Sequence, residues 1–153
     1  MSLPLESISY AQTGASLGMK INPFYKVESL HEGLDLIAPQ GDPVLAVADG
    51  IVTDVIKSRK GLGNVVEITH KGGYVTRYAH LADVTVSKGQ TVKRGKKIAG
   101  VGISGNTFAP HLHYEVIKDG VHLDPVDFFY ASVTPDEYAN IKFMASRTGQ
   151  SLD

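Results

Sequence analysis

The chain contains no cysteine among its 153 residues. Without thiols, neither a disulfide nor a zinc site built on cysteine can form, so any metal ion must be held by histidine and carboxylate side chains. The same absence leaves the redox compartment open, because a chain without thiols suits either side of a membrane. The candidate ligands are therefore six histidines and sixteen acidic residues.

Long apolar runs and an excess of one charge are also missing. No stretch approaches the roughly 18 apolar residues of a membrane helix, so we expect no membrane span in this chain. A formal net charge of −1 favours neither nucleic acid nor an anionic membrane as partner. The first residues lack both a basic start and an apolar block, so no export signal is visible. A chain of this length fits one domain with a sizeable core.

Sixteen glycines indicate many tight turns. Between residues 19 and 124, short runs rich in β-branched residues alternate with turn signals, which is typical of β-strands. We predict an all-β fold of antiparallel sheets, two-layered or resembling a barrel-sandwich, with a short C-terminal helix. The predicted strands are residues 34–38, 44–47, 51–58, 65–69, 74–81, 84–86, 91–92, 97–101 and a run that begins at residue 111.

The two ends of the chain differ from this β-rich part. Residues 1–17 have no clear periodicity and are predicted to be an irregular lead-in. Near the other end, Thr134 followed by a proline and two acids predicts the start of a helix. Apolar residues then recur at helical spacing to about residue 146. We therefore divide the chain into residues 1–17, a β-domain over 18–130 and a helical extension over 131–153.

The most informative stretch is residues 111–116. A strand places alternate side chains on opposite faces. One face of this strand would carry Leu112, Tyr114 and Val116, and the other would carry His111, His113 and Glu115. The first face can be core, whereas a packed core would not choose two imidazoles and a carboxylate. Two histidines at this spacing can converge on one metal ion, or one can bind the ion while the other works beside it.

Other residues could complete such a site. In a strand, His31 and Asp35 would share one face on either side of Gly33, which would leave room for a close approach. His80 lies near the end of the predicted strand 74–81. Each feature alone fits an ordinary polar residue on an exposed strand face. Together, two imidazoles and a carboxylate suit zinc and leave one position open for water, while further histidines can act as general acid or base. The remaining two histidines, at 70 and 122, stand beside glycine turns and are interpreted as structural.

Three ordered motifs resemble a known family. His31-x-Gly33-x-Asp35, Tyr78-x-His80-Leu81 and His111-Leu112-His113-Tyr114-Glu115 resemble the lysostaphin- or LytM-type zinc metallopeptidases, which are β-rich endopeptidases that cut peptide cross-links of bacterial peptidoglycan. Residues 38–44, 48–52, 88–92 and 102–106 also look like that family's framework. The resemblance extends over about residues 18–129, so it identifies the β-domain as a metallopeptidase domain of this type.

The resemblance implies roles for individual residues. One zinc ion would be bound by His31, Asp35 and His113. His80 and His111 would handle protons and the developing oxyanion, with His111 favoured as the base. Tyr25 stands where some relatives have a tyrosine that stabilises the tetrahedral intermediate. Glu115 would either orient an imidazole or be a surface residue.

Two departures from the family pattern lie on loops. Asp42 stands where threonine or serine is commoner, and Phe108-Ala109 stand where a Thr-Gly pair is commoner. Both could reshape the substrate groove, and neither removes a predicted ligand.

The function implied is a zinc-dependent endopeptidase that hydrolyses peptide cross-links or bridges of peptidoglycan in the cell envelope, either periplasmic or extracellular. The alternatives are a zinc-containing non-catalytic module that binds cell wall or activates a hydrolase, and the same chemistry on another glycine-rich protein. A biotinyl- or lipoyl-carrier domain shares the strand texture but would need a Met-Lys hairpin, which the β-rich part lacks. Which bond is cut, a glycine bridge or a D-alanyl cross-link, and the oligomeric state stay open.

Overall fold

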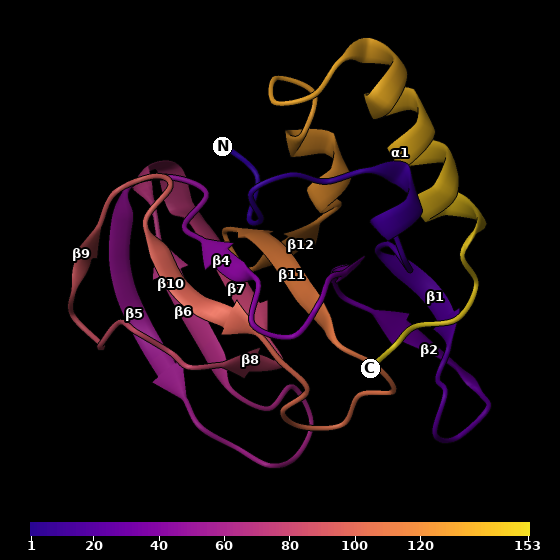
Figure 1. Ribbon diagram of the computed structural model, residues 1–153, viewed down its shortest axis with the longest axis horizontal. Coiled ribbons are helices and arrows are strands. Elements are labelled where there is room, and N and C mark those ends of the chain that lie inside the picture. Colours follow the sequence, from indigo (N-terminus) through magenta and orange to yellow (C-terminus); the bar gives the residue numbers. More distant parts are fainter.

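The computed structural model describes residues 1–153 and consists mainly of antiparallel strands, with one α-helix beside them (Figure 1). The largest sheet has seven strands in the order β12-β11-β7-β6-β5-β9, with β3 also paired to β11. A second sheet has the order β4-β10-β8, and β1 and β2 form a separate pair. The predicted fold class is therefore confirmed, without a closed barrel. No helix is long and apolar enough to span a membrane.

The strands are short, as the glycine-rich turns predict. Their bounds are β1 Gly18–Ile21, β2 Glu28–His31, β3 Leu34–Ile37, β4 Pro43–Leu45, β5 Gly50–Ile56, β6 Val65–Thr69, β7 Tyr74–Ala79, β8 Leu81–Ala82, β9 Thr91–Val92, β10 Lys97–Val101, β11 His111–Lys118 and β12 Val121–Leu123. Three 3-10 turns lie at Tyr10–Gln12, Lys71–Gly73 and Pro125–Phe128, and α1 is Pro135–Arg147.

Strand β11 is central to the arrangement. It pairs with β3 and β12 along one edge and with β7 along the other. In these registers His113 lies opposite both Asp35 and Ala79. The predicted alternation is confirmed, because Leu112, Tyr114 and Val116 belong to the hydrophobic core. That core fixes the strand and therefore the direction in which its histidines point.

The chain ends pack on the same core as the sheets. Leu5 and Ile8 from the lead-in, and Ile141 and Ala145 from α1, are buried in one cluster of 25 residues. Helix α1 begins at the predicted cap: the Thr134 hydroxyl accepts a hydrogen bond from the backbone of Glu137, completing a capping box. Such a cap stabilises a helix by about 1 kcal/mol.

Two strand predictions are wrong. Residues 84–86 do not form a strand, because Thr85 donates one backbone hydrogen bond to Ile98 but no ladder of bonds follows. The predicted strand 74–81 ends at Ala79, because His80 has a φ of +56° that breaks the extended backbone. The strands β1 and β2 were not among the predicted ones.

Candidate metal centre

His31 and Asp35 come together across a bend rather than along one strand face, which corrects the sequence-based expectation. His31 ends β2, Asp35 lies in β3, and Glu32 and Gly33 connect them. The prediction that Gly33 allows a close approach is confirmed. A Cβ at Gly33 would lie 2.5 Å from the Tyr114 carbonyl oxygen. The bend brings Nε2 of His31 to 3.1 Å from Oδ1 of Asp35.

Asp35 is the meeting point of the cluster. Its Oδ1 atom lies 3.3 Å from Nδ1 of His113 and 3.3 Å from Nε2 of His111. Two ligand atoms that sit about 2.0–2.1 Å from a tetrahedral ion are about 3.3 Å apart. The distances from Asp35 to His31 and to His113 are close to this value, and the ligand atoms of all three residues lie within 4.8 Å of one another, so these side chains form a possible metal-binding group. All three side chains are buried.

His80 and His111 stand beside these three residues. The rings of His80 and His111 have centroids 4.8 Å apart, and the His80 ring lies 6.1 Å from that of His113. The left-handed backbone at His80 turns this side chain toward the cluster, whereas the Tyr78 ring is in the core. The structure thus brings together the four histidines and the one aspartate of the predicted centre.

In each imidazole one ring nitrogen faces the other cluster residues, and the second, which we call the outer nitrogen, bonds an acceptor outside that group. The acceptors are the carbonyl of Ser16 for His31 (2.9 Å), that of Ser104 for His80 (2.7 Å), that of Ala109 for His111 (2.9 Å), and Oε2 of Glu115 for His113 (2.7 Å). When the outer N–H donates to such an acceptor, the inner nitrogen of the neutral ring presents a lone pair. The three carbonyl acceptors carry no side-chain signal in the sequence.

Glu115 is buried and links His113 to two further side chains. Its Oε1 atom accepts from Arg77 at 2.7 Å and lies 2.9 Å from Nε2 of His122. Burial raises the pKa of Glu115, but hydrogen bonding to His113 and the charges of His113 and Arg77 outweigh it and hold the pKa below its usual value. Glu115 thus remains a carboxylate that orients an imidazole, and His122 contacts that carboxylate.

The residue that the sequence did not reveal is Asp153. Its Oδ2 atom lies 2.7 Å from both Nε2 of His31 and Nδ1 of His113. Its Oδ1 atom lies 2.7 Å from Nε2 of His80 and 2.8 Å from Nε2 of His111. A carboxylate 38 residues after the end of the last motif carries no pattern that would place it here.

The carboxylates of Asp35 and Asp153 change the pKa values of the histidines around them. Burial works to lower the pKa of His31 and of His111, but hydrogen bonds to Asp153 and Asp35 raise each to about 9. Burial would raise the pKa of Asp35, but its hydrogen bonds to the histidines lower it. A metal ion needs neutral imidazole ligands, so its binding would release protons from this cluster.

Tyr25 is not brought into the cluster. It lies in the turn between β1 and β2, its side chain is 74% exposed, and its backbone N–H donates to Oδ1 of Asn22. Phe108, one of the two loop departures, packs against Phe24 with ring centroids 5.2 Å apart. Beside the cluster, a depression lined by Leu30 and Leu62 adjoins His31 and His113.

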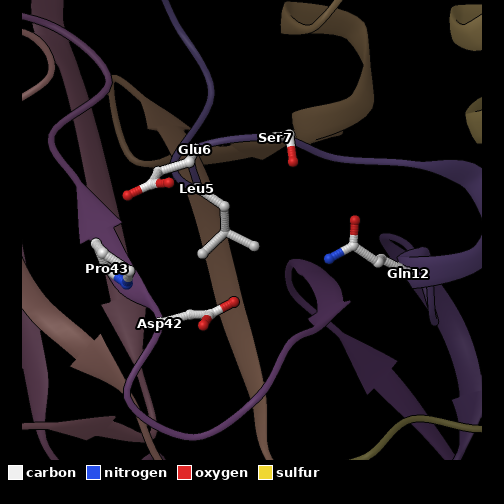
Figure 2. Close-up of a pocket in the computed structure, with 6 residues that line it drawn as sticks. All are labelled: Leu5, Glu6, Ser7, Gln12, Asp42 and Pro43. Carbon is white, nitrogen blue, oxygen red and sulfur yellow. The ribbon is translucent and has the colours of Figure 1, made fainter.

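Asp42, the second departure from the family pattern, lies away from the histidine and aspartate cluster. Figure 2 shows it in a hollow with Glu6 and Gln12, between the lead-in and the start of β4. None of the five cluster residues lines this hollow.

A buried cluster of histidine and aspartate side chains in a β-sheet protein is compatible with a metallopeptidase. Residues 29–125 match the model of peptidase family M23, and the chain belongs to this family. The predicted relationship to the lysostaphin- and LytM-type peptidases is thereby confirmed.

Individual relatives and solved structures have the names of peptidases. The DD-carboxypeptidase/endopeptidase Mpg of Neisseria meningitidis serogroup B is 41% identical over 123 residues, which are 80% of this chain and 28% of that protein. A zinc-containing peptidase of Vibrio cholerae has 39% identity and a TM-score of 0.68, with 74% of this chain and 35% of that chain covered. The catalytic domain of lysostaphin from Staphylococcus simulans has 28% identity and a TM-score of 0.69, and the match covers 76% of this chain and 90% of that chain. The chain spans about a quarter of the length of the curated relatives.

Proposed function

We propose that this chain is a zinc-dependent endopeptidase that hydrolyses peptide cross-links or bridges of bacterial peptidoglycan in the cell envelope, either in the periplasm or outside the cell. The observation that carries the proposal is the convergence of His31, Asp35 and His113 at zinc-ligand spacing beside His80 and His111. Membership of family M23 and the names of the relatives support the substrate class.

His31, Asp35 and His113 would hold one zinc ion, which supplies a Lewis acid for the scissile carbonyl and lowers the pKa of the attacking water. Nε2 of His111 would take the proton of that water. The hydrogen bond from its Nδ1–H to Ala109 keeps Nε2 available for this task. Nε2 of His80 would face the developing oxyanion, and one of these two histidines would return a proton to the leaving amine.

The proposal assigns Tyr25 to the stabilisation of the tetrahedral intermediate. Its support is the resemblance and its position on the β1–β2 turn, on the chain that leads into His31. The phenol is exposed, so a bound peptide could reach it from solvent.

The test of the metal assignment replaces His113 or Asp35 by alanine. Each variant should lose bound zinc, measured by elemental analysis, and should release no new free amines from purified sacculi. His70→Gln is a matched control, because it alters a buried histidine outside the cluster. A variant that digests sacculi normally without metal would contradict the mechanism. Zinc binding by the wild-type chain without amine release would favour the non-catalytic cell-wall module.

The roles of the other two histidines predict a different pattern. His111→Ala and His80→Ala should keep the zinc content of the wild-type chain but release amines about 10²–10⁴-fold more slowly. The larger loss should fall on His111, the proposed base.

A further inference from the structure

Lys57 and Arg59, in the loop between β5 and β6, line an open hollow, which we call the basic hollow. Ile103 and Ser104, in the loop before β11, also line it, and no acidic residue does. Both cationic side chains are exposed, and neither forms an ion pair within the chain. The lysines and arginines that form ion pairs lie elsewhere: Arg77, Lys93 and Lys142. The basic hollow therefore presents two unpaired positive charges to solvent.

The two loops that line the basic hollow lie side by side at one end of the sheets (Figure 1). The N–H of Asn106 in the second loop donates to the carbonyl of Gly61 in the first at 2.8 Å. Oγ of Ser104 accepts from the N–H of Asn64 at 2.9 Å and donates to the carbonyl of Leu81 at 2.8 Å. These polar groups bond one another, so the two cationic side chains are left to bind a ligand.

The basic hollow adjoins the proton-transfer side of the cluster. The carbonyl of Ser104 accepts from Nδ1 of His80 at 2.7 Å. The carbonyl of Leu62, in the same loop as the two cations, accepts from the backbone N–H of His80 at 2.8 Å. Both loops are thus fixed to the residue that carries one of the two proposed proton-transfer groups.

The depression beside the proposed metal ligands has the opposite charge. Its carboxylates are those of Glu32, Glu115 and Asp153, and no lysine or arginine lines it. Arg77 pairs with Glu115, whereas Glu32 is exposed. A carboxylate on a bound peptide would be repelled in this acidic depression and attracted in the basic hollow. The charges on the two sides of the cluster therefore favour one direction of a charged peptide.

The proposed mechanism places the leaving amine toward the basic hollow. The carbonyl under attack contacts the ion at the three proposed ligands, and the amine that leaves receives a proton from His80 or His111. The residue that carries this amine therefore extends from the cluster on the side of these histidines. On that side, the Ser104 carbonyl that holds His80 belongs to the lining of the basic hollow.

We propose that Lys57 and Arg59 form a subsite for a carboxylate on the substrate residue that carries the leaving amine. Glu32 would disfavour the reverse direction, which brings that carboxylate to the acidic depression. The inference rests on the proposed function for the reaction, and it defines the substrate class more closely. The bond that is cut would join an acyl group to an amino acid that keeps a free carboxylate. A D-alanyl cross-link to such an amino acid fits, whereas residues inside a glycine bridge carry no carboxylate.

The expected selectivity is modest because both cations are exposed. A guanidinium can donate to both oxygens of a carboxylate, and an ammonium adds a second positive charge. Water and salt screen each exposed pair, which limits its contribution to about fivefold in affinity. The two pairs together correspond to about a tenfold preference for a peptide that has the carboxylate.

The test uses two synthetic peptides with the same D-alanyl amide bond. In one the leaving residue has a free carboxylate, and in the other this group is a carboxamide. Calorimetry measures the affinity of both for the zinc-loaded His111→Ala chain, which should cut them too slowly to disturb binding. The same chain with Lys57→Gln and Arg59→Gln lacks both charges. Lys88→Gln is the matched control, because it removes an exposed lysine that lines neither the basic hollow nor the acidic depression.

We expect the His111→Ala chain to bind the carboxylate peptide about tenfold more tightly than the carboxamide peptide. Adding Lys57→Gln and Arg59→Gln should remove this preference and leave the affinity for the carboxamide peptide unchanged. Salt should shrink the preference, and Lys88→Gln should keep it. In the chain with His111 intact, Lys57→Gln and Arg59→Gln should raise KM for the carboxylate peptide and leave kcat unchanged.

Equal affinity of the His111→Ala chain for the two peptides would overturn the inference. An equal loss of both affinities on removal of the two cations would also overturn it, because Lys57 and Arg59 would then only shape their loop. If the preference and its loss are observed while the chain with His111 intact cuts neither peptide, the subsite stands and the proposed endopeptidase function fails. If that chain cuts both peptides with equal kcat/KM, the proposed function stands and the subsite fails.

Discussion

Nε2 of His113 lies 2.7 Å from Oε2 of Glu115, two residues further along the same strand. The contact fixes the ring so that Nδ1 points at Asp35, 3.3 Å away. Arg77 bridges Glu115 and Glu67 and so holds the buried carboxylate in place. The orientation of a proposed metal ligand therefore depends on a carboxylate that is not itself a proposed ligand.

Replacing Glu115 by glutamine should weaken zinc binding about 10–100-fold, because a neutral amide holds the His113 ring less firmly and lowers its basicity. The measurement is competition with a chelator of known affinity. Glu67→Gln is the matched control, because Glu67 pairs with the same arginine but does not contact His113. Equal zinc affinity in the two variants would show that the Glu115 contact does not matter to the centre.

Gly33→Ala should destabilise the fold by about 1–3 kcal/mol, because the new methyl group would meet the Tyr114 carbonyl oxygen and push β11 away. Chemical denaturation measures the change in the free energy of unfolding. Gly100→Ala is the control, because a Cβ there meets its nearest atoms at an ordinary 3.4 Å. If Gly33→Ala were as stable as Gly100→Ala, the tight packing of this bend would be refuted.

Stability should depend on pH through His70. Burial holds the pKa of His70 below its ordinary value of 6.5, and the ring bonds the Asp49 carbonyl and the Thr76 hydroxyl. Below about pH 6.5, His70 therefore binds a proton more readily in the unfolded chain than in the folded chain. The stabilisation by neutral His70 is complete above that pH and is lost as the pH falls.

Denaturant titration between pH 5 and 8 compares the wild-type chain with the His70→Gln variant. The difference in unfolding free energy between the two chains should be about 1–3 kcal/mol at pH 7.5 and should shrink below pH 6.5. The subtraction cancels the titration of the cluster histidines, which both chains share. A difference that is constant over this range would contradict the assignment.

Tyr25→Phe should leave zinc content and stability unchanged, because the phenol is exposed and outside the cluster. If the hydroxyl stabilises the tetrahedral intermediate, amine release should fall about 100-fold. Tyr130→Phe, which alters another exposed tyrosine, serves as control. Equal rates in the two variants would reject a catalytic role for Tyr25.

Much of the fold followed from local patterns. The alternation along residues 111–116 predicted which side chains of β11 enter the core, and the cap at Thr134 predicted the start of α1. These features succeed because strand alternation and capping depend on residues only a few positions apart. The predicted strand at 84–86 fails because a strand needs a partner ladder, which composition does not reveal.

The geometry of the site was only partly predictable. Residue types and their order indicated His31, Asp35 and His113 as ligands. Strand periodicity does not predict the bend at Gly33, which brings His31 to Asp35, or the left-handed backbone at His80, which directs the His80 ring. Asp153 was missed because its contacts join residues 40 to 122 positions apart in the chain. Such contacts depend on the tertiary path of the chain after α1.

Zinc-dependent cleavage of peptidoglycan peptides can be measured by mass spectrometry of fragments that the full chain releases from defined sacculi before chelation, after chelation and after zinc is restored. We expect fragments with new amino and carboxyl ends at peptide cross-links or bridges, their loss when the metal is removed, and their return when zinc is added. Release of the same fragments at the same rate by the zinc-free chain would contradict the proposed zinc dependence.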